Sequence, residues 1–420
     1  MGRWSSQPSE QHHQAKKAAI PGPFGLPIVG LLFVFTGSLT HRLLAKLSQS
    51  CKALLLMAFC AGFTRFTISS QPDTAKEILN SSAFADRPIK ESAYELFHRA
   101  MGFDPYGVYW RNLRRISATH LFCPKSIASF GAFRREIGNK MIGEIKGLMC
   151  VKGQVEIKRV LHFGSLNNVM MSVFGKTYDF DQNGSQAHEL EELVSEGYEL
   201  LGILNWSDLF LKKNLNWSDH FPILGLLDLQ GVRKRCRNLA SKVNIGTDTV
   251  AILLEWILAG MAFSDLDHPH LPYLLAIIKE TIRMHPPGPL LSWARLAIHD
   301  VHIGENFIPA GTTAMVNMWA ITHDEKIWSE PNEFKPERFL DEEVSIMGSD
   351  LRLAPFGSGR RVCPGKAMGI ATVQLWLAQL LQSFNWVPSD NGVVDLSECL
   401  KLSLEMKKPL VCKAVYRVRC

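Results

Sequence analysis

The spacing of apolar residues predicts a hairpin early in the chain and helices after it. Alternating apolar runs over 54–62 and 64–69 indicate two paired strands. Pro72 and Asp73 then open a short helix that reaches Leu79, for which Asp73 suits the N-cap. From Lys125 to Lys212 the pattern stays helical, and a further helix ends before His285.

A tight glycine-rich loop, 355–365, leads into another helix near the end of the chain. Apolar residues recur there at helical spacing, at Met368, Ala371, Leu375, Ala378 and Leu381. Pro364 suits the first turn of this helix because proline lacks the N–H that an initial turn leaves unpaired. Cys363 therefore stands at the helix start, where the helix dipole and free N–H groups favour the thiolate that binds metals.

The neighbours of Cys363 predict the kind of ligand that the loop holds. Gly357, Gly359 and Gly365 let the backbone adopt positive φ and approach a flat ligand closely. Arg360 and Arg361 place fixed positive charge beside the cysteine, suited to carboxylates. We therefore expect an anionic cysteine next to a bulky acidic ligand.

Composition limits the classes of function. The 420 residues are 46% hydrophobic, enough to bury a large core, and a net charge of +6 is too small to argue for nucleic acid as a partner. Nine scattered cysteines without CxxC spacing are typical of a reducing compartment, so we expect neither a disulfide framework nor a zinc ribbon. No run reaches the eighteen or so apolar residues of a membrane span.

The first thirty residues divide into two parts. Residues 1–20 form a polar stretch that we expect to be disordered. Residues 21–30 are punctuated by prolines and glycines and cannot be helical.

Three further patterns carry chemistry. Trp110 and Arg114 share one face of a basic helix, where both can donate to a carboxylate or simply form a cation–π contact. Asp248 and Thr249 form a small polar notch in an otherwise apolar helix, suited to passing protons, although either residue could instead cap an ordinary helix start. Glu280 and Arg283 lie at i, i+3 on one helix face.

The pattern Phe356-x-x-Gly359-x-Arg361-x-Cys363-x-Gly365 resembles the haem-thiolate loop of the cytochrome P450 family. The resemblance implies a mainly α cytochrome P450 fold, a single catalytic domain over residues 21–420, with a small β-rich lobe near the N-terminus. It implies haem b with Cys363 as axial iron ligand. Phe356, Gly359 and Gly365 would belong to the cofactor-binding loop.

The other motifs resemble further parts of the same family. Trp110, Arg114, Arg361 and, less firmly, Arg295 would meet haem propionates, and Asp248 and Thr249 would be the catalytic acid–alcohol pair. Glu280 and Arg283 would bury a carboxylate between two guanidiniums, the second from Arg338 in the Pro-Glu-Arg-Phe stretch. The runs 292–300 and 314–321 look like a plant subfamily tied to organ and seed growth (KLUH-like).

The chain also departs from the family. Residues 21–30 resemble the hinge of microsomal members, but the anchor that should precede it is absent. Blocks of sequence are missing near 244–245 and 261–262, which shortens the lead-in to the Asp248–Thr249 helix.

The resemblance implies a monooxygenase that inserts one oxygen atom of O2 into a small apolar substrate. Electrons would come from NADPH through NADPH–cytochrome P450 reductase, docked on a basic face of Arg111, Arg115, Arg360, Arg361 and Lys366. The family location is the cytosolic face of the endoplasmic reticulum membrane, although a chain without the anchor could be cytosolic and touch a membrane surface. Two alternatives stay open: haem-thiolate chemistry without external electrons, and a truncated, defective product that binds haem poorly.

Overall fold

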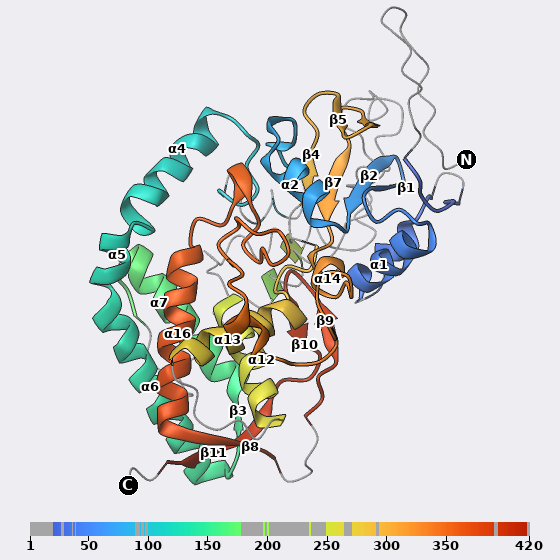
Figure 1. Cartoon of the computed structure of the whole chain (residues 1–420). Helices are drawn as coiled ribbons and strands as arrows, with labels where there is room; N and C mark the ends of the chain where they lie inside the picture. The colour runs from blue at the N-terminus through green and yellow to red at the C-terminus, as the bar shows by residue number, and fades with distance from the viewer. Residues whose placement is uncertain are drawn as a thin grey trace, which may run out of the picture.

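The computed structural model shows a helical body joined to a smaller β-rich lobe (Figure 1). It describes residues 20–26, 29–35, 37, 39–88, 93, 96, 100–177, 196–197, 200, 235–236, 249–263, 271–290, 294–389 and 394–417. The mainly α prediction with a β-rich lobe near the N-terminus is confirmed.

The lobe is built on the predicted hairpin. Strands β1 (Met57–Ala61) and β2 (Thr64–Ser69) pair antiparallel, and the stacked rings of Phe59 and Phe66, 5.3 Å apart, join their buried faces. Strand β7 (Thr313–Val316) adds to β2 in parallel, and β4 (Arg295–Leu296) pairs with β7. This order, β1-β2-β7-β4, brings Arg295 from late in the chain into the lobe. Strands β5 (Val301–Ile303) and β6 (Asn306–Ile308) form a separate hairpin.

The proline-rich segment runs along the edge of this sheet. The Ala58 N–H donates to the Pro21 carbonyl at 3.0 Å, and the Leu31 N–H donates to the Cys60 carbonyl at 2.7 Å. The described residues between 21 and 30 are non-helical, as predicted. Ile20 is already buried, so the packed lobe starts one residue before the predicted boundary, and residues 1–19 lie outside the described part.

Short helices complete the lobe: η1 (Leu32–Phe35), α1 (Thr40–Ser50), α2 (Pro72–Asn80) and η2 (Ser82–Phe84). The prediction of Asp73 as the N-cap of α2 is wrong. Gln71 occupies the N-cap without a side-chain hydrogen bond, and Asp73 lies in the first turn. Pro72 at the first helical position sets this start, since its fixed φ suits a helix and its missing N–H needs no partner there.

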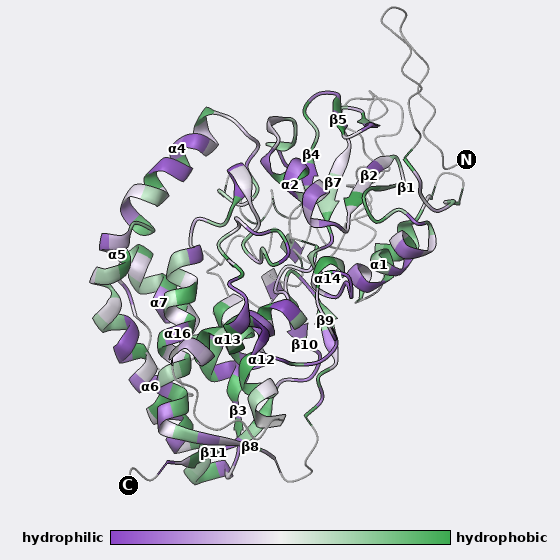
Figure 2. Cartoon of the chain, viewed as in Figure 1, coloured by the Kyte–Doolittle hydropathy of each residue, from purple (hydrophilic) through white to green (hydrophobic). Residues whose placement is uncertain are grey.

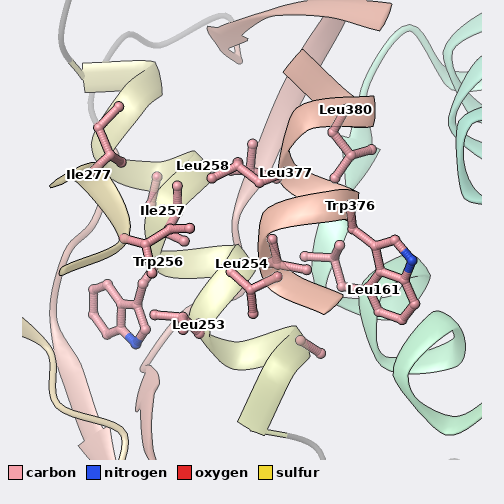
Figure 3. Close-up of a cluster of buried hydrophobic side chains, with 14 of the residues drawn as sticks. Leu161, Leu253, Leu254, Trp256, Ile257, Leu258, Ile277, Trp376, Leu377 and Leu380 are labelled. Atoms are coloured by element: carbon pink, nitrogen blue, oxygen red, sulfur yellow. The ribbon is translucent and has the colours of Figure 1, made fainter. Parts of the chain in front are cut away.

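The helical body is organised around α12 (Thr249–Phe263), which is buried from Ala251 to Ala259. It packs on α7 (Ile157–Phe174), α13 (Leu271–Met284) and α16 (Lys366–Ser383), and α6 (Gly131–Lys152) packs outside α7 and α16. Figure 3 shows the contact, with Leu258 of α12 facing Leu377 of α16. A helix that is apolar all round has no solvent face, so it becomes the core.

The remaining elements are short. The helices α4 (Val108–Ile116), η3 (Ser117–Leu121) and α5 (Pro124–Ser129) line one side, while α14 (Met318–Thr322), α15 (Arg338–Asp341) and η5 (Gly359–Arg361) interrupt long loops. Strands β3 (Val155–Glu156), β11 (Val411–Tyr416) and β8 (Phe384–Pro388) form one sheet, and β9 (Glu398–Leu400) and β10 (Leu404–Met406) form a hairpin. No helix in the described ranges is long and apolar enough to cross a membrane.

Helix α16 differs in detail from its prediction. It begins at Lys366 with Gly365 as N-cap, so Pro364 lies before the helix rather than in its first turn. Of the predicted apolar stripe, Leu381 is buried, whereas Met368, Ala371, Leu375 and Ala378 are partly exposed. The buried face instead carries Thr372, Val373, Trp376, Leu377, Leu380 and Leu381, because α6 and α12 flank that side.

Candidate functional site

The loop around Cys363 is held by its own backbone and by α2. The Cys363 N–H donates to the Phe356 carbonyl at 2.9 Å, closing the loop. Gly357 and Gly359 have φ of +68° and +67°, as predicted, but Gly365 has φ of −86°, so its predicted positive φ is wrong.

Packing explains two of these glycines. A Cβ on Gly359 would lie 2.1 Å from the Leu79 carbonyl oxygen, so glycine at this position lets the end of α2 approach the loop closely. A Cβ on Gly365 would lie 3.3 Å from the Phe122 ring. At Gly357 a Cβ would meet no described atom within 4 Å, which leaves its positive φ as the reason for glycine there.

Cys363 is mostly buried, and burial outweighs the effects that the sequence suggested. Burial raises the pKa of the Cys363 thiol, although a backbone hydrogen bond from Gly365 and the charges of Arg114 and Lys366 lower it. The expected thiolate preference is therefore wrong for this protein without a metal. A positive metal centre bound to the sulfur would favour the thiolate.

Arg361 lies inside the site with one nitrogen unused. Its Nε donates to the Ala85 carbonyl at 2.9 Å and its Nη2 donates to the Asp104 carbonyl at 3.0 Å. Its Nη1 is buried without a hydrogen-bond partner among the described residues. Burial lowers the pKa of Arg361 to about 10. A buried donor without an acceptor is costly, which marks a place for an anionic ligand.

Arg295 presents the same feature from β4. Its Nη2 donates to the Ser358 carbonyl at 3.2 Å, while its Nη1 is buried and without a partner in the described ranges. Burial lowers the pKa of Arg295 to about 9, and the charges of Arg361 and Arg114 lower it further. The structure thus brings Arg295, which the sequence predicted less firmly than the other propionate ligands, into the same cluster as Arg361 and Arg114.

Trp110 and Arg114 lie on α4, as predicted, but the indole N–H points elsewhere. Trp110 Nε1 donates to the Met101 carbonyl at 3.0 Å, so in this structure it is not free for a carboxylate. The Trp110 ring instead lies between two guanidiniums, 4.2 Å from Arg361 and 5.6 Å from Arg114. The cation–π contact left open by the sequence is therefore present. Burial lowers the pKa of Arg114, and the charge of Cys363 raises it.

The sequence analysis missed Arg87. This buried arginine follows η2, and its pKa is lowered well below the usual value by burial and then by the charges of Arg295, Arg361 and Arg114. The sequence gives little indication of this role for Arg87, because an arginine followed by a proline before a loop is a common pattern. We call Arg87, Arg114, Arg295 and Arg361 the arginine cluster.

The arginine cluster fits the two propionates of haem. Its guanidiniums repel one another in a buried setting, and the unused nitrogens of Arg295 and Arg361 are aimed at no described acceptor. A ligand with two carboxylates beside Cys363 would supply both the acceptors and the charge. The residues present therefore suit a haem with Cys363 as axial ligand.

A second cluster forms, as predicted, around the buried carboxylate of Glu280. Arg283 donates from Nε and Nη2 to the two carboxylate oxygens of Glu280, both at 2.8 Å, and Arg338 Nε lies 3.2 Å from the same carboxylate. The Lys335 N–H donates to Glu280 as well, at 2.8 Å. Arg283 Nη1 donates to the carbonyls of Thr322 and Pro331, which ties α13 to the loops around it.

The catalytic pair is described at one of its two positions. Thr249 is the first residue of α12 and is exposed, and Asp248 lies outside the described residues. The predicted gap at 244–245 also falls outside the described part, whereas 261–262 lies within the last turn of α12.

The predicted basic face is present without Arg361. Arg111, Arg115 and Arg360 are exposed and Lys366 is partly exposed, but Arg361 is buried. Its Nε and Nη2 donate to backbone carbonyls inside the site and its Nη1 is buried, so the guanidinium is not available to a partner protein. Hydrophilic residues recur along the outer side of α4 in Figure 2.

Comparisons with known proteins agree with this geometry. The family model "Cytochrome P450" matches residues 20–244 and 260–413. The chain is 55% identical to "Cytochrome P450 78A5" of Arabidopsis thaliana over 96% of this chain and 89% of the relative. It is 45% identical to "Cytochrome P450 78A9" of the same plant, over 96% and 88%, and 44% identical to "Cytochrome P450 78A3" of Glycine max, over 94% and 87%. Matches of this extent show that the chain belongs to the cytochrome P450 family.

Proposed function

We propose that this P450 inserts one oxygen atom of O2 into a C–H bond of a small apolar substrate, with the other atom leaving as water. The electrons would come from NADPH through a flavoprotein reductase. The observation that carries the proposal is the arginine cluster around Cys363, whose unused nitrogens call for a dianionic cofactor.

In this proposal, haem b binds with its iron at Cys363 and its propionates at Arg295, Arg361 and Arg114. Thiolate-ligated haem supplies oxygen activation, because the thiolate pushes electron density that favours O–O cleavage. The chain's own part is to keep the Cys363 loop closed through the Phe356 carbonyl and to shield the sulfur from water.

Asp248 and Thr249 are proposed to handle protons. The hydroxyl of Thr249 can donate a hydrogen bond, and the carboxyl of Asp248 can return protons from solvent, to which Thr249 is exposed. Thr249 is exposed and precedes the buried part of α12, so its hydroxyl can reach water next to the core.

The reductase is proposed to dock on Arg111, Arg115, Arg360 and Lys366. Arg360 Nη1 donates to the Tyr106 hydroxyl at 3.3 Å, and Arg111 lies 5.8 Å from the same ring, so one aromatic ring holds two of these cations at the surface. Exposed positive charge attracts an acidic partner and speeds its association, and salt weakens this attraction by screening.

The β-rich lobe is proposed to rest on the endoplasmic reticulum membrane, facing the cytosol. Four large apolar side chains near the start of the lobe are strongly exposed, namely Phe24, Leu26, Phe33 and Phe63. The Gly62 N–H donates to the Val29 carbonyl at 3.0 Å, which keeps the hairpin tip beside the proline-rich segment. A shared apolar surface of this kind suits a lipid interface.

A second candidate is a shortened, defective family member that binds haem poorly. The alignment with the 78A5 relative covers 479 positions, more than the chain's 420 residues, so the relative has residues that this chain lacks. Loss of a covering helix would expose apolar surface to water, which costs about 25 cal/mol of free energy for each Å2 exposed.

One experiment separates the two candidates. The carbon monoxide difference spectrum of the purified, dithionite-reduced protein should show the long-wavelength Soret band of thiolate-ligated haem, and Cys363→Ala should lose that band while keeping its helical circular dichroism. No band from the unaltered protein would favour the defective form. A band that survives in Cys363→Ala would refute the ligand assignment.

A further inference from the structure

The arginine cluster contains an acidic side chain that neither the sequence motifs nor the proposed function uses. Asp86 follows η2 and precedes Arg87, and its Oδ1 accepts hydrogen bonds from the Arg87 and Tyr106 N–H groups, both at 2.8 Å. The same oxygen lies 3.7 Å from Arg361 Nη2. The side chain of Asp86 is one fifth exposed, so it faces this partly buried site rather than open solvent.

The backbone of Asp86 connects the other members of the cluster. Its carbonyl accepts the Leu296 N–H at 2.9 Å, next to Arg295 on β4. The bond from Tyr106 fixes the residues just before α4, which carries Arg114. Segments bearing all members of the arginine cluster therefore meet at this one residue.

Charge sets Asp86 apart from an ordinary turn residue. Asp86 raises the pKa of both Arg87 and Arg361, against the burial and the mutual repulsion that lower it. Asp104 also raises the pKa of Arg361, and its backbone carbonyl accepts a hydrogen bond from Arg361 Nη2. A carboxylate this close to several buried guanidiniums changes the field of the whole site.

We propose that Asp86 is a positioning residue whose carboxylate sets the net charge of the arginine cluster and thereby the reduction potential of the haem iron. This inference rests on the proposed function, since it requires a haem at Cys363. Reduction adds an electron to the iron, so a nearby negative charge disfavours it and a nearby positive charge favours it. Loss of the Asp86 charge should move the potential to more positive values.

The substitution Asp86→Asn separates charge from hydrogen bonding. The amide keeps an oxygen that accepts the Arg87 and Tyr106 N–H groups, but it carries no charge. A second variant, Arg87→Gln, removes a positive charge from the same place. The two variants should shift the potential in opposite directions, and the double variant should lie near the unaltered protein. If Asp86 and Arg87 had a merely structural role, both substitutions would shift the reduction potential in the same direction.

Asp395→Asn is the matched control. Asp395 also accepts a backbone N–H, from Ser397 at 3.0 Å, and pairs with a cation, Lys408 at 3.1 Å, in the loop before β9. Removing the Asp395 charge changes the net charge of the protein by the same amount but leaves the arginine cluster unaltered. The reduction potential of the Asp395→Asn variant should therefore equal that of the unaltered protein.

The measurement is a spectroelectrochemical titration of each haem-loaded protein, with the carbon monoxide spectrum recorded beside it. Opposite shifts for Asp86→Asn and Arg87→Gln, with thiolate ligation kept, support the inference.

Equal potentials in all variants overturn it while leaving the proposed function intact. A folded Asp86→Asn protein that loses haem also overturns it, because the amide leaves the cluster more positive and should hold the propionates at least as well. If Asp86→Asn does not fold, a shift of Arg87→Gln to more positive values refutes the charge argument. If the unaltered protein shows no thiolate-ligated haem, the proposed function fails and this inference fails with it.

Discussion

Arginines are buried in two clusters of this protein, and their surroundings are opposite. Around Glu280, Arg283 and Arg338 share one carboxylate, and further nitrogens of Arg283 donate to backbone carbonyls. Around Cys363, Arg295 and Arg361 each keep a buried nitrogen without a described partner, and the guanidiniums lower one another's pKa.

The difference separates a structural cluster from a binding cluster. A complete network fixes geometry and needs nothing more, whereas an incomplete one carries a desolvation cost that a ligand can remove. The Glu280 cluster should thus govern whether the protein folds, and the arginine cluster whether it takes up its cofactor.

The largest effect is expected at the complete cluster. Glu280→Gln leaves Arg283 and Arg338 buried without a counter-charge and should lower the free energy of unfolding by about 3–5 kcal/mol. Urea denaturation followed by circular dichroism measures this. Glu337→Gln is the control: Glu337 is exposed and bonds to Tyr273, so its loss should change stability by less than about 1 kcal/mol. Equal effects of the two substitutions would contradict the assignment of the Glu280 cluster.

A smaller effect, on binding rather than folding, is expected at the incomplete cluster. Arg295→Met should weaken haem binding roughly ten- to hundredfold, since a hydrogen bond to a charged group contributes about 1.5–3 kcal/mol. The haem-free protein should lose little stability, because the lost bond to Ser358 is offset by relief of repulsion from Arg361 and Arg114.

Haem titration and urea denaturation of the haem-free protein provide the two readouts for Arg295→Met. Arg338→Met serves for comparison and should destabilise the haem-free protein, because it breaks the complete cluster. Should Arg295→Met destabilise the haem-free protein as much as Arg338→Met, the two clusters would not differ in kind.

The smallest effect concerns thiol reactivity without haem. Burial raises the pKa of Cys363, whereas hydrogen bonds from Ser126 lower the pKa of Cys123. Cys123 should therefore form the reactive thiolate at a lower pH than Cys363. Iodoacetamide labelling of the haem-free protein across a pH series, read for each cysteine by mass spectrometry, tests this order. Labelling of Cys363 first would show that the arginine cluster stabilises the thiolate by itself.

Much of the site follows from local sequence. The spacing around Cys363 indicated the ligand loop, and the positive φ of Gly357 and Gly359 is a backbone property that glycine alone makes easy. The order Glu280, Arg283 and Arg338 indicated a cluster that the structure contains, because an i, i+3 pair on a helix is already a neighbour before the fold forms.

Other features depend on contacts between distant segments, and the sequence did not show them. Which face of α16 is buried depends on α6 and α12, since a helix apolar on most sides gives no preference. The Trp110 indole bonds to Met101 because the loop before α4 folds back on it.

By itself the sequence determined the family and the order of the motifs, and it predicted Cys363 as the iron ligand, since these rest on residue identity and short spacing. The tertiary structure decided how the charges are balanced. Burial raises the pKa of the Cys363 thiol and outweighs the effect of the helix start that would lower it. Arg361 donates its hydrogen bonds inward and does not belong to the docking face. Arg87 and Asp86 join a site that is assembled from four separate segments. Electrostatic energies depend on distance and dielectric, which exist only once the chain has folded.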